Sequence, residues 1–184
     1  MMTTAFLFRS ATPDDAEVLA AFGERTFRET FGPHNRPEDM DAYCGATYTV
    51  AGQRHELADP DRETLIARRG DEVAGYAQLR AGPAPDCVTG PDPIEILRFY
   101  VDGRWHGRGL AQALMDAAVH AAERRSARTL YLAVWEKNLR AIAFYERQGF
   151  RRAGERGFVL GADHQTDNVM VRPTRFVAAG APRS

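Results

Sequence analysis

The spacing of hydrophobic positions changes repeatedly along the chain between the two periods that mark strands and helices. In residues 108–125, apolar residues fall on one helical stripe, which predicts an amphipathic helix. Residues 130–135 form a continuous apolar run, as expected of a strand covered on both faces. Residues 94–101 are the strongest strand candidate. Strands therefore alternate with helices, which predicts an α/β fold and excludes a helical bundle or an all-β sandwich.

Turn and cap residues place the remaining elements. Gly70-Asp71 between two β-rich runs predicts an antiparallel hairpin. Thr12 followed by Pro13 is typical of a helix start, and Gly149 of a helix end. The other expected elements are strands at 5–9, 63–69, 72–80, 158–160 and 168–171, helices at 49–58 and 138–148, a proline-rich loop at 81–93, and a loop with one short helix between 27 and 48.

Length and composition narrow the class of protein. The 184 residues suit one domain, expected over 1–172 with a loose tail at 173–184. With 24 Lys and Arg against 25 Asp and Glu, the net charge is −1, which excludes the basic surplus of a nucleic-acid-binding protein. No apolar run approaches the roughly 18–20 residues of a membrane span, and the first ten residues do not resemble a signal peptide. We expect a cytoplasmic protein with neither a nucleic-acid nor a membrane partner.

Cysteine and histidine usage argues against a metal or a covalent intermediate. Cys44 and Cys87 are too few for a disulfide scaffold, and neither falls in a motif. The five histidines show no metal-ligand spacing. We therefore expect no bound metal and no acyl-enzyme on cysteine.

A glycine-rich turn after the 94–101 strand is the most informative stretch. At a helix start the first N–H groups have no internal partner and the helix dipole is positive. Gly107 and Gly109 remove side chains that would keep a phosphate from the backbone, while Arg104, His106 and Arg108 add cationic donors. The turn fits a pyrophosphate. The alternative is an ordinary tight connection with solvated arginines.

Two common phosphate motifs do not match this turn. A P-loop requires a Lys-Ser or Lys-Thr pair, which the chain lacks. A dinucleotide fingerprint requires a third glycine where this chain has Gln112. A nucleotide-binding or nicotinamide-dependent enzyme is therefore disfavoured.

The turn instead resembles the pyrophosphate motif [QR]-x-x-G-x-[GA] of the GNAT superfamily of acyl-CoA-dependent N-acetyltransferases. The preferred register starts at His106, because it begins the helix correctly; a second register starts at Arg104. A second stretch, N-x-x-A-x-x-x-Y followed by Gly149-Phe150, is also typical of that superfamily. The matching residues are His106, Gly107, Arg108, Gly109, Leu110 and Ala111 in the first motif, and Asn138, Ala141 and Tyr145 in the second.

The resemblance covers about residues 63–172 and implies a fold and a cofactor. The implied fold has a mixed central sheet of about six to seven strands, with two splayed parallel strands at its centre and helices on both sides. The pantetheine arm of acetyl-CoA would enter between the splayed strands, along the backbone of Phe99, Tyr100 and Val101. Asn138, Ala141 and Tyr145 would share the cofactor-facing side of the next helix. Dimers are common in the superfamily, which leaves a homodimer open.

The resemblance also implies direct acetyl transfer to a primary amine. Tyr145 is the candidate general acid for the departing thiolate, the alternative being a core tyrosine. Glu95, eleven residues before His106, is the candidate general base; the alternatives are an ion pair, for example with Arg98, or a water chain. Strict alternation puts Glu95 on the face of Phe99 and Val101, which a bulge would change.

The acceptor is a small-molecule amine in this interpretation, and the stretches 26–32, 37–43, 158–163 and 165–167 resemble a GNAT branch that includes bacterial polyamine (spermidine/spermine) acetyltransferases. Phe27, Phe31 and Tyr43 would pack on a slender cation and Glu29 would attract it. The alternative is a solvated acidic loop over core aromatics. Peptide or protein N-termini, aminoglycosides, and a CoA-binding sensor without turnover remain as other functions.

Overall fold

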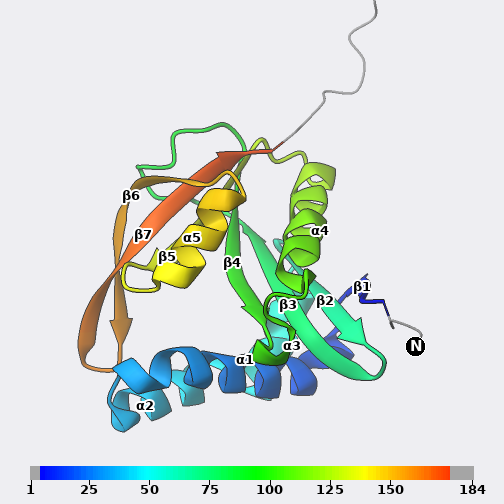
Figure 1. The fold of residues 1–184 in the computed structure, drawn as a ribbon, viewed down its shortest axis with the longest axis vertical. Coiled ribbons are helices and arrows are strands. Elements are labelled where there is room, and N and C mark those ends of the chain that lie inside the picture. Colours follow the sequence, from blue (N-terminus) through cyan, green and yellow to red (C-terminus); the bar gives the residue numbers. More distant parts are fainter. Residues whose placement is uncertain (1–4, 175–184) are drawn as a thin grey trace, which may run out of the picture.

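The computed structural model describes residues 5–174, which form one seven-stranded sheet with the order β1-β2-β3-β4-β5-β7-β6 (Figure 1). All neighbouring strands are antiparallel except β4 and β5, which are parallel. The mixed sheet expected from the sequence is confirmed. The strands are β1 (Leu7–Ser10), β2 (Arg62–Arg69), β3 (Glu72–Ala81), β4 (Pro93–Val101), β5 (Thr129–Trp135), β6 (Arg151–Leu160) and β7 (Asp163–Pro173); the helices are α1 (Ala16–Phe31), α2 (Pro37–Thr47), α3 (Val50–Ala58), α4 (Leu110–Arg124) and α5 (Leu139–Arg147), with short 3-10 turns η1 (Pro13–Asp15), η2 (Gly32–His34) and η3 (Gly103–Trp105).

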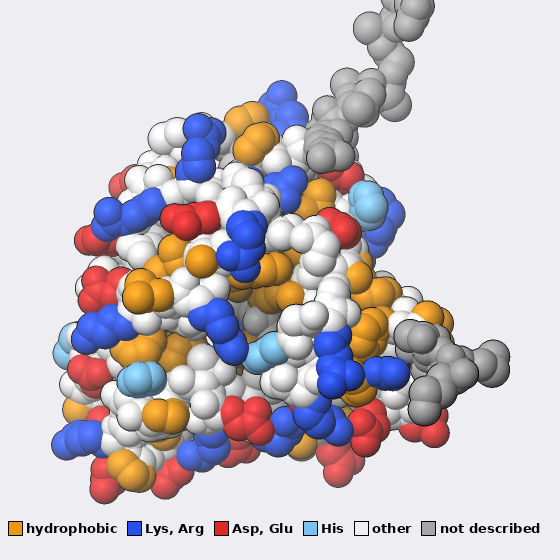
Figure 2. Space-filling view, viewed as in Figure 1, with side chains coloured by type: hydrophobic (Ala, Val, Ile, Leu, Met, Phe, Trp, Pro, Cys, Tyr) orange, Lys and Arg blue, Asp and Glu red, His pale blue; other side chains and the backbone are white. Residues whose placement is uncertain are grey.

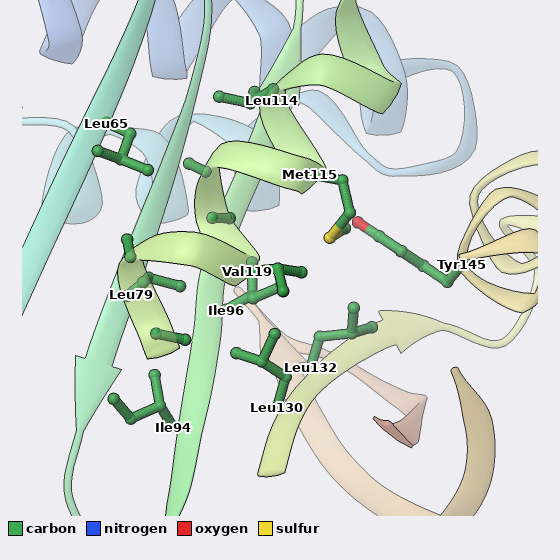
Figure 3. Packing of buried hydrophobic residues seen from close by; sticks show 14 of the residues in the cluster. Leu65, Leu79, Ile94, Ile96, Leu114, Met115, Val119, Leu130, Leu132 and Tyr145 are labelled. Carbon is green, nitrogen blue, oxygen red and sulfur yellow. The ribbon is translucent and has the colours of Figure 1, made fainter. Parts of the chain in front are cut away.

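Helices cover both faces of the sheet, with α1, α2 and α3 grouped together and apart from α4 and α5 (Figure 1). Alternation along β2 sends Leu65 and Ile66 to opposite faces. Leu65 packs in the cluster that contains Leu114 of α4, whereas Ile66 packs with Leu19 of α1. The α4 cluster is the largest core and extends across β4 and β5 to Tyr145 of α5 (Figure 3).

The two parallel strands at the centre of the sheet diverge. β4 and β5 pair only at their beginnings, from Pro93 with Thr129 to Glu95 with Tyr131. Beyond Glu95, β4 remains paired with β3 and β5 remains paired with β7. The splayed centre implied by the family resemblance is therefore present.

Two parts of the sequence-based prediction were too short. Between 27 and 48 the structure has the last turns of α1 and an eleven-residue helix α2, instead of a loop with one short helix. Strands β6 and β7 span ten and eleven residues, although the sequence predicted only 158–160 and 168–171. β6 lies at the edge of the sheet and is largely exposed, so its apolar signal is weak.

The first two residues of the expected tail take part in the fold. Pro173 is the last residue of β7, and the Thr174 N–H donates to the Arg128 carbonyl at 3.0 Å. The rest of the expected tail, 175–184, lies outside the described residues. Among residues 5–174, no helix is both long and apolar enough to cross a membrane.

Candidate active site

A deep cleft of about 740 Å³ opens where β4 and β5 diverge. Figure 2 shows a hollow in this view of the molecule, with hydrophobic side chains beside it and basic and histidine side chains at its edge. Residues of β4 and β5 line the cleft together with residues of α1, α2, α5, β6 and β7. Since opposite faces of a splayed sheet both open into this gap, the cleft has two halves. One is bounded by the turn before α4 and by α5, and the other by α1, α2, β6 and β7.

The glycine-rich turn closes the first half. Gly107 and Gly109 have φ angles of +70° and +83°, a region of backbone conformation that residues other than glycine rarely adopt. Gly109 caps the N-terminus of α4, and Leu110, fully buried, holds the helix against the core. His106, Gly107 and Ala111 line the cleft. The turn thus presents open backbone at a helix start, as an anion site requires.

The imidazole of His106 is held in one orientation. Its Nε2 lies 3.1 Å from the Val101 carbonyl oxygen and its Nδ1 lies 3.1 Å from Arg140 Nη1. Because the carbonyl accepts and the guanidinium donates, these contacts fit a neutral ring that carries its proton on Nε2. Arg140 is thereby brought to the mouth of the cleft beside the turn.

Two arginines of the turn face elsewhere. Arg104 pairs with Asp102 at 3.0 Å and with Glu72 at 3.1 Å, and Arg108 lies over the Trp105 ring. Neither lines the cleft. This arrangement favours the motif register that starts at His106 over the one that starts at Arg104.

Helix α5 brings Asn138, Ala141 and Tyr145 to the same side of the cleft. The Asn138 side-chain oxygen accepts a hydrogen bond from the Ala141 N–H at 3.2 Å, so this residue caps the helix that it begins. Phe99 and Val101 of β4 face these residues across the gap, whereas the Tyr100 side chain lies on the opposite face, with its hydroxyl 2.7 Å from that of Tyr48. The cofactor-binding residues expected from the sequence therefore converge here, except Arg108, Gly109 and Leu110, which support the turn without lining the cleft.

Tyr145 is packed among aromatic rings on the cofactor side. Its ring meets Phe99 and Phe150 edge to face, at 6.2 and 5.8 Å between centroids. Figure 3 shows the side chain directed from α5 toward Met115 of α4. Tyr145 is 9% exposed, and burial raises the pKa of its hydroxyl well above the ordinary value. The hydroxyl therefore stays protonated at neutral pH, as a general acid must.

The structure corrects the face assigned to Glu95. The pairing of β4 with β3 skips Leu97, so β4 carries a bulge there. Because one residue is added, Glu95 shares a face with Arg98, and the predicted alignment with Phe99 and Val101 is wrong. Glu95 consequently points away from the cofactor half.

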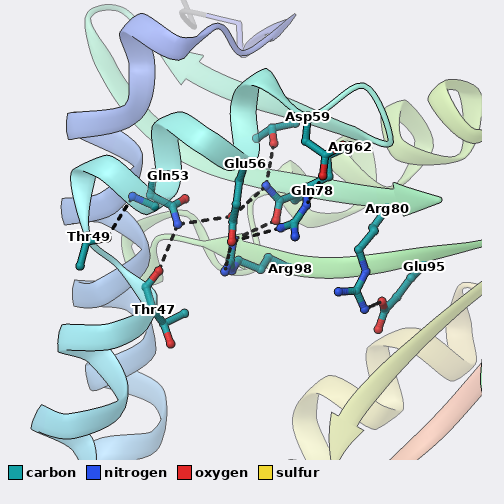
Figure 4. A network of polar contacts seen from close by, with 12 residues as sticks. Thr47, Thr49, Gln53, Glu56, Asp59, Arg62, Gln78, Arg80, Glu95 and Arg98 are labelled. Atoms are coloured by element: carbon teal, nitrogen blue, oxygen red, sulfur yellow. Dashed lines mark hydrogen bonds and ion pairs between the residues drawn. The ribbon is translucent and has the colours of Figure 1, made fainter. Parts of the chain in front are cut away.

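The carboxylate of Glu95 is 1% exposed and lies between two arginines. It pairs with Arg80 (Figure 4) and, at 3.0 Å, with Arg156 of β6. Glu95 does not line the cleft. These contacts favour the ion-pair alternative, with Arg80 and Arg156 in place of Arg98, over a general base.

Aromatic side chains dominate the second half of the cleft. Phe27 stacks on Tyr43 with centroids 4.7 Å apart, and Phe31 lies 4.6 Å from Phe27. Glu29 also lines the cleft and forms an exposed pair with Arg25 at 3.2 Å. The four acceptor residues proposed from the sequence are thus brought together.

Sequence reasoning assigned no acceptor role to several residues of this half. Trp135, Arg156, Phe158 and Asp167 line the cleft, and they come from β5, β6 and β7. Phe158 meets Tyr43 at 5.5 Å and Trp135 meets Phe31 at 6.0 Å between ring centroids. The sequence signals were weak: Phe158 and Asp167 fall in stretches that resemble the polyamine branch, and the apolar run at 169–171 suggests a strand but not a site.

Comparison with known proteins identifies the family. The acetyltransferase (GNAT) family matches residues 24–150. An uncharacterized N-acetyltransferase of Mycobacterium tuberculosis is 37% identical over 158 residues, which cover 86% of this chain and 97% of that protein. The spermine/spermidine N(1)-acetyltransferase of Bacillus subtilis is 32% identical over 88 residues, 47% of this chain and 58% of that protein. The crystal structure of the PaiA N-acetyltransferase of Thermoplasma acidophilum in complex with coenzyme A has a TM-score of 0.75 at 16% identity, over 92% of this chain and 99% of that chain.

The fold and the cleft are thus those of an acyltransferase that acts on amines. The chain belongs to the GNAT family and is an N-acetyltransferase that uses acetyl-CoA. The residues present fit that cofactor: β4 has no strand partner on one side beyond Glu95, and a Cβ at Gly107 or Gly109 would meet nothing within 4 Å. Open backbone is therefore available both for the pantetheine amides and for the pyrophosphate.

The glycine-rich turn at 106–111 should contribute to the affinity for acetyl-CoA. If two backbone N–H groups bind the pyrophosphate at roughly 1.5 kcal/mol each, acetyl-pantetheine should bind about 100-fold more weakly than acetyl-CoA. Isothermal titration of the purified protein with each compound measures this ratio. Equal affinities would show that the turn does not hold the pyrophosphate.

Proposed function

We propose that this enzyme acetylates a primary amine on a slender apolar or cationic molecule, with a polyamine as the leading candidate. The observation that supports this most is the composition of the second half of the cleft. Aromatic rings of Phe31, Tyr43 and Trp135 form apolar walls, and carboxylates of Glu29 and Asp167 stand among them. Such a site attracts an ammonium group and packs on the chain that bears it. A cytoplasmic location and a homodimer stay predictions.

The chain's residues have separate roles in this proposal. Acetyl-CoA, when bound, supplies an activated acetyl group as a thioester. The backbone of 99–101, the turn at 106–111 and Asn138 hold and orient it, while the aromatic walls exclude water from the second half. The Tyr145 hydroxyl gives its proton to the departing sulfur. Glu95, the base proposed from the sequence, is tied to two arginines and acts through Arg156 as a positioning residue.

A thiol-release assay tests the proposed acceptor class. Acetyl-CoA is supplied with spermidine, spermine, simple alkylamines, an aminoglycoside and a short peptide with a free N-terminus. We expect turnover with the polyamines and weak turnover with short alkylamines, because the latter lack a second cation for Glu29. Turnover with the peptide alone would contradict the polyamine assignment, and acetyl-CoA binding without turnover of any amine would favour a sensor.

A further inference from the structure

Asp167 is a largely buried carboxylate in the second half of the cleft. On β7 it pairs with Trp135 of β5 on one side and with Arg156 of β6 on the other. Its side chain lines the cleft, yet the residue is only 7% exposed. Paired residues of neighbouring antiparallel strands point to the same face, so Asp167, Trp135 and Arg156 form one row across the sheet.

The Asp167 carboxylate has no hydrogen-bond donor of its own. Among residues 5–174, no side chain or backbone group donates to it, and no cation forms an ion pair with it. Arg156, its neighbour in the row, forms an ion pair with Glu95 instead, with 3.0 Å between Nη1 and Oε1. A carboxylate that is largely buried and has no donor in the protein loses much of its hydration, and such groups concentrate at functional sites.

An ammonium group would supply the positive charge and the hydrogen-bond donors that the Asp167 carboxylate lacks. It carries a compensating charge and up to three N–H donors. The Trp135 and Phe31 rings beside Asp167 fit the apolar stem of such an amine. The other ionisable groups that line this half of the cleft are Arg156 on β6, Arg98 and Tyr100 on β4, Glu29 on α1 and Tyr43 on α2, and His34 and Lys137 lie against the Trp135 ring.

We propose that Asp167 binds the ammonium group of the acceptor and takes its proton, so that Asp167 is the general base of the reaction. The inference rests on the proposed transfer to an amine and deepens it by placing the nitrogen. Burial raises the pKa of Asp167 above the usual value, and the charge of Arg156 only partly opposes that shift. A carboxylate with a raised pKa is a better proton acceptor near neutral pH. Glu95 pairs with Arg156, which lies next to Asp167 on the neighbouring strand, so Glu95 is a positioning residue.

Asp167 takes one proton from the ammonium group and leaves a neutral amine. The nitrogen lone pair forms the C–N bond with the acetyl carbon while the C–S bond breaks, and the sulfur takes the Tyr145 proton. The nitrogen loses a second proton, which restores the Tyr145 hydroxyl. Asp167 releases its proton to water, so ammonium and thioester yield amide, thiol and one proton.

The variant Asp167→Asn tests this role through its pH profile. For the best amine of the panel, we expect kcat/KM to fall about 100-fold or more, as for loss of a general base. The acidic limb of the wild-type pH profile should disappear in the variant. The control Glu155→Gln removes an exposed carboxylate from β6. It should leave both kcat/KM and the acidic limb of the pH profile unchanged. A fall of less than about threefold, or an unaltered acidic limb, would overturn the proposal.

Amine binding without acetyl-CoA gives a second readout that needs no turnover. Isothermal titration with spermidine, or with n-butylamine, should show binding to the wild type and at least about tenfold weaker binding to Asp167→Asn. If the wild type turns over no amine but shows this difference, the proposed acceptor is wrong and the role of Asp167 in binding stands. Equal binding to both proteins, or no binding to the wild type, contradicts the inference.

Thermal stability separates loss of folding from loss of function. A carboxyl whose pKa is raised by folding destabilises the native state once pH exceeds its unfolded pKa of about 3.9. Asp167→Asn should therefore unfold at a higher temperature than the wild type at pH 7, with a difference that shrinks as pH falls toward about 4. A lower unfolding temperature at pH 7 would show that Asp167 is a structural residue and overturn the proposal.

Discussion

Replacing Tyr145 with phenylalanine should lower kcat about 100-fold while leaving the affinity for acetyl-CoA nearly unchanged. The hydroxyl is the only group removed, and the ring contacts with Phe99 and Phe150 that hold the side chain remain. Burial keeps the hydroxyl protonated by raising its pKa, so its loss removes a proton donor and not a charge. Steady-state rates with saturating acetyl-CoA, together with a binding titration, measure the two quantities.

Tyr131→Phe is the matched control. Tyr131 is also a buried tyrosine on a central strand, but it does not line the cleft and its hydroxyl lies 3.5 Å from the Pro83 carbonyl oxygen. We expect turnover of this variant to remain within about threefold of the wild type. If Tyr145→Phe behaves like the control, Tyr145 is a core residue and the proton comes from elsewhere.

The second large effect concerns stability and the polar network beneath α3 (Figure 4). Arg98 of β4 is paired with Glu56 of α3, and it donates to Gln78 of β3 at 2.8 Å. The Arg98 side chain is 10% exposed. Removing one partner of a buried ion pair leaves an uncompensated charge, so Arg98→Met should lower the free energy of unfolding by about 3 kcal/mol. Arg62, 3.1 Å from Glu56, retains part of the pairing. Urea unfolding measures the loss.

The same network predicts how the decrease in the free energy of unfolding caused by Arg98→Met depends on pH. Burial acts to raise the pKa of Glu56, but the hydrogen bond and charge of Arg98 outweigh it, and the pKa lies below its usual value. A depressed carboxyl pKa stabilises the native state at neutral pH, and this stabilisation is lost as pH falls through the folded pKa. The difference between wild type and Arg98→Met should therefore narrow in acid.

A double variant tests the coupling. Glu56→Leu combined with Arg98→Met removes both charges together, so it should recover a large part of the stability that Arg98→Met loses. If the double variant is as unstable as the sum of the two single variants, the two residues do not form an energetically coupled pair. In that case Arg98 stabilises the protein mainly by packing over the Tyr48 ring, 5.7 Å away.

The cofactor half of the cleft could be inferred from the sequence because its determinants are local. The turn that ends at Gly109 and the helix that begins after Asn138 each form within a short stretch, where caps, positive φ angles and helical period leave a readable pattern. Spacing along one helix places Asn138 and Tyr145 on one side without any knowledge of the fold. The structure places both residues on the lining of the cleft, as that spacing predicted.

The acceptor half depends on contacts between distant segments, and sequence patterns do not report them. The bulge at Leu97 forms where β4 pairs with β3, and it reverses the face of Glu95. Asp167 and Arg156 meet only because β6 and β7 pair beside β5. Local spacing and caps thus determined the family, the turn and the cofactor side. Strand register and pairing, which are set by packing across the whole sheet, decided which carboxylate faces the cleft.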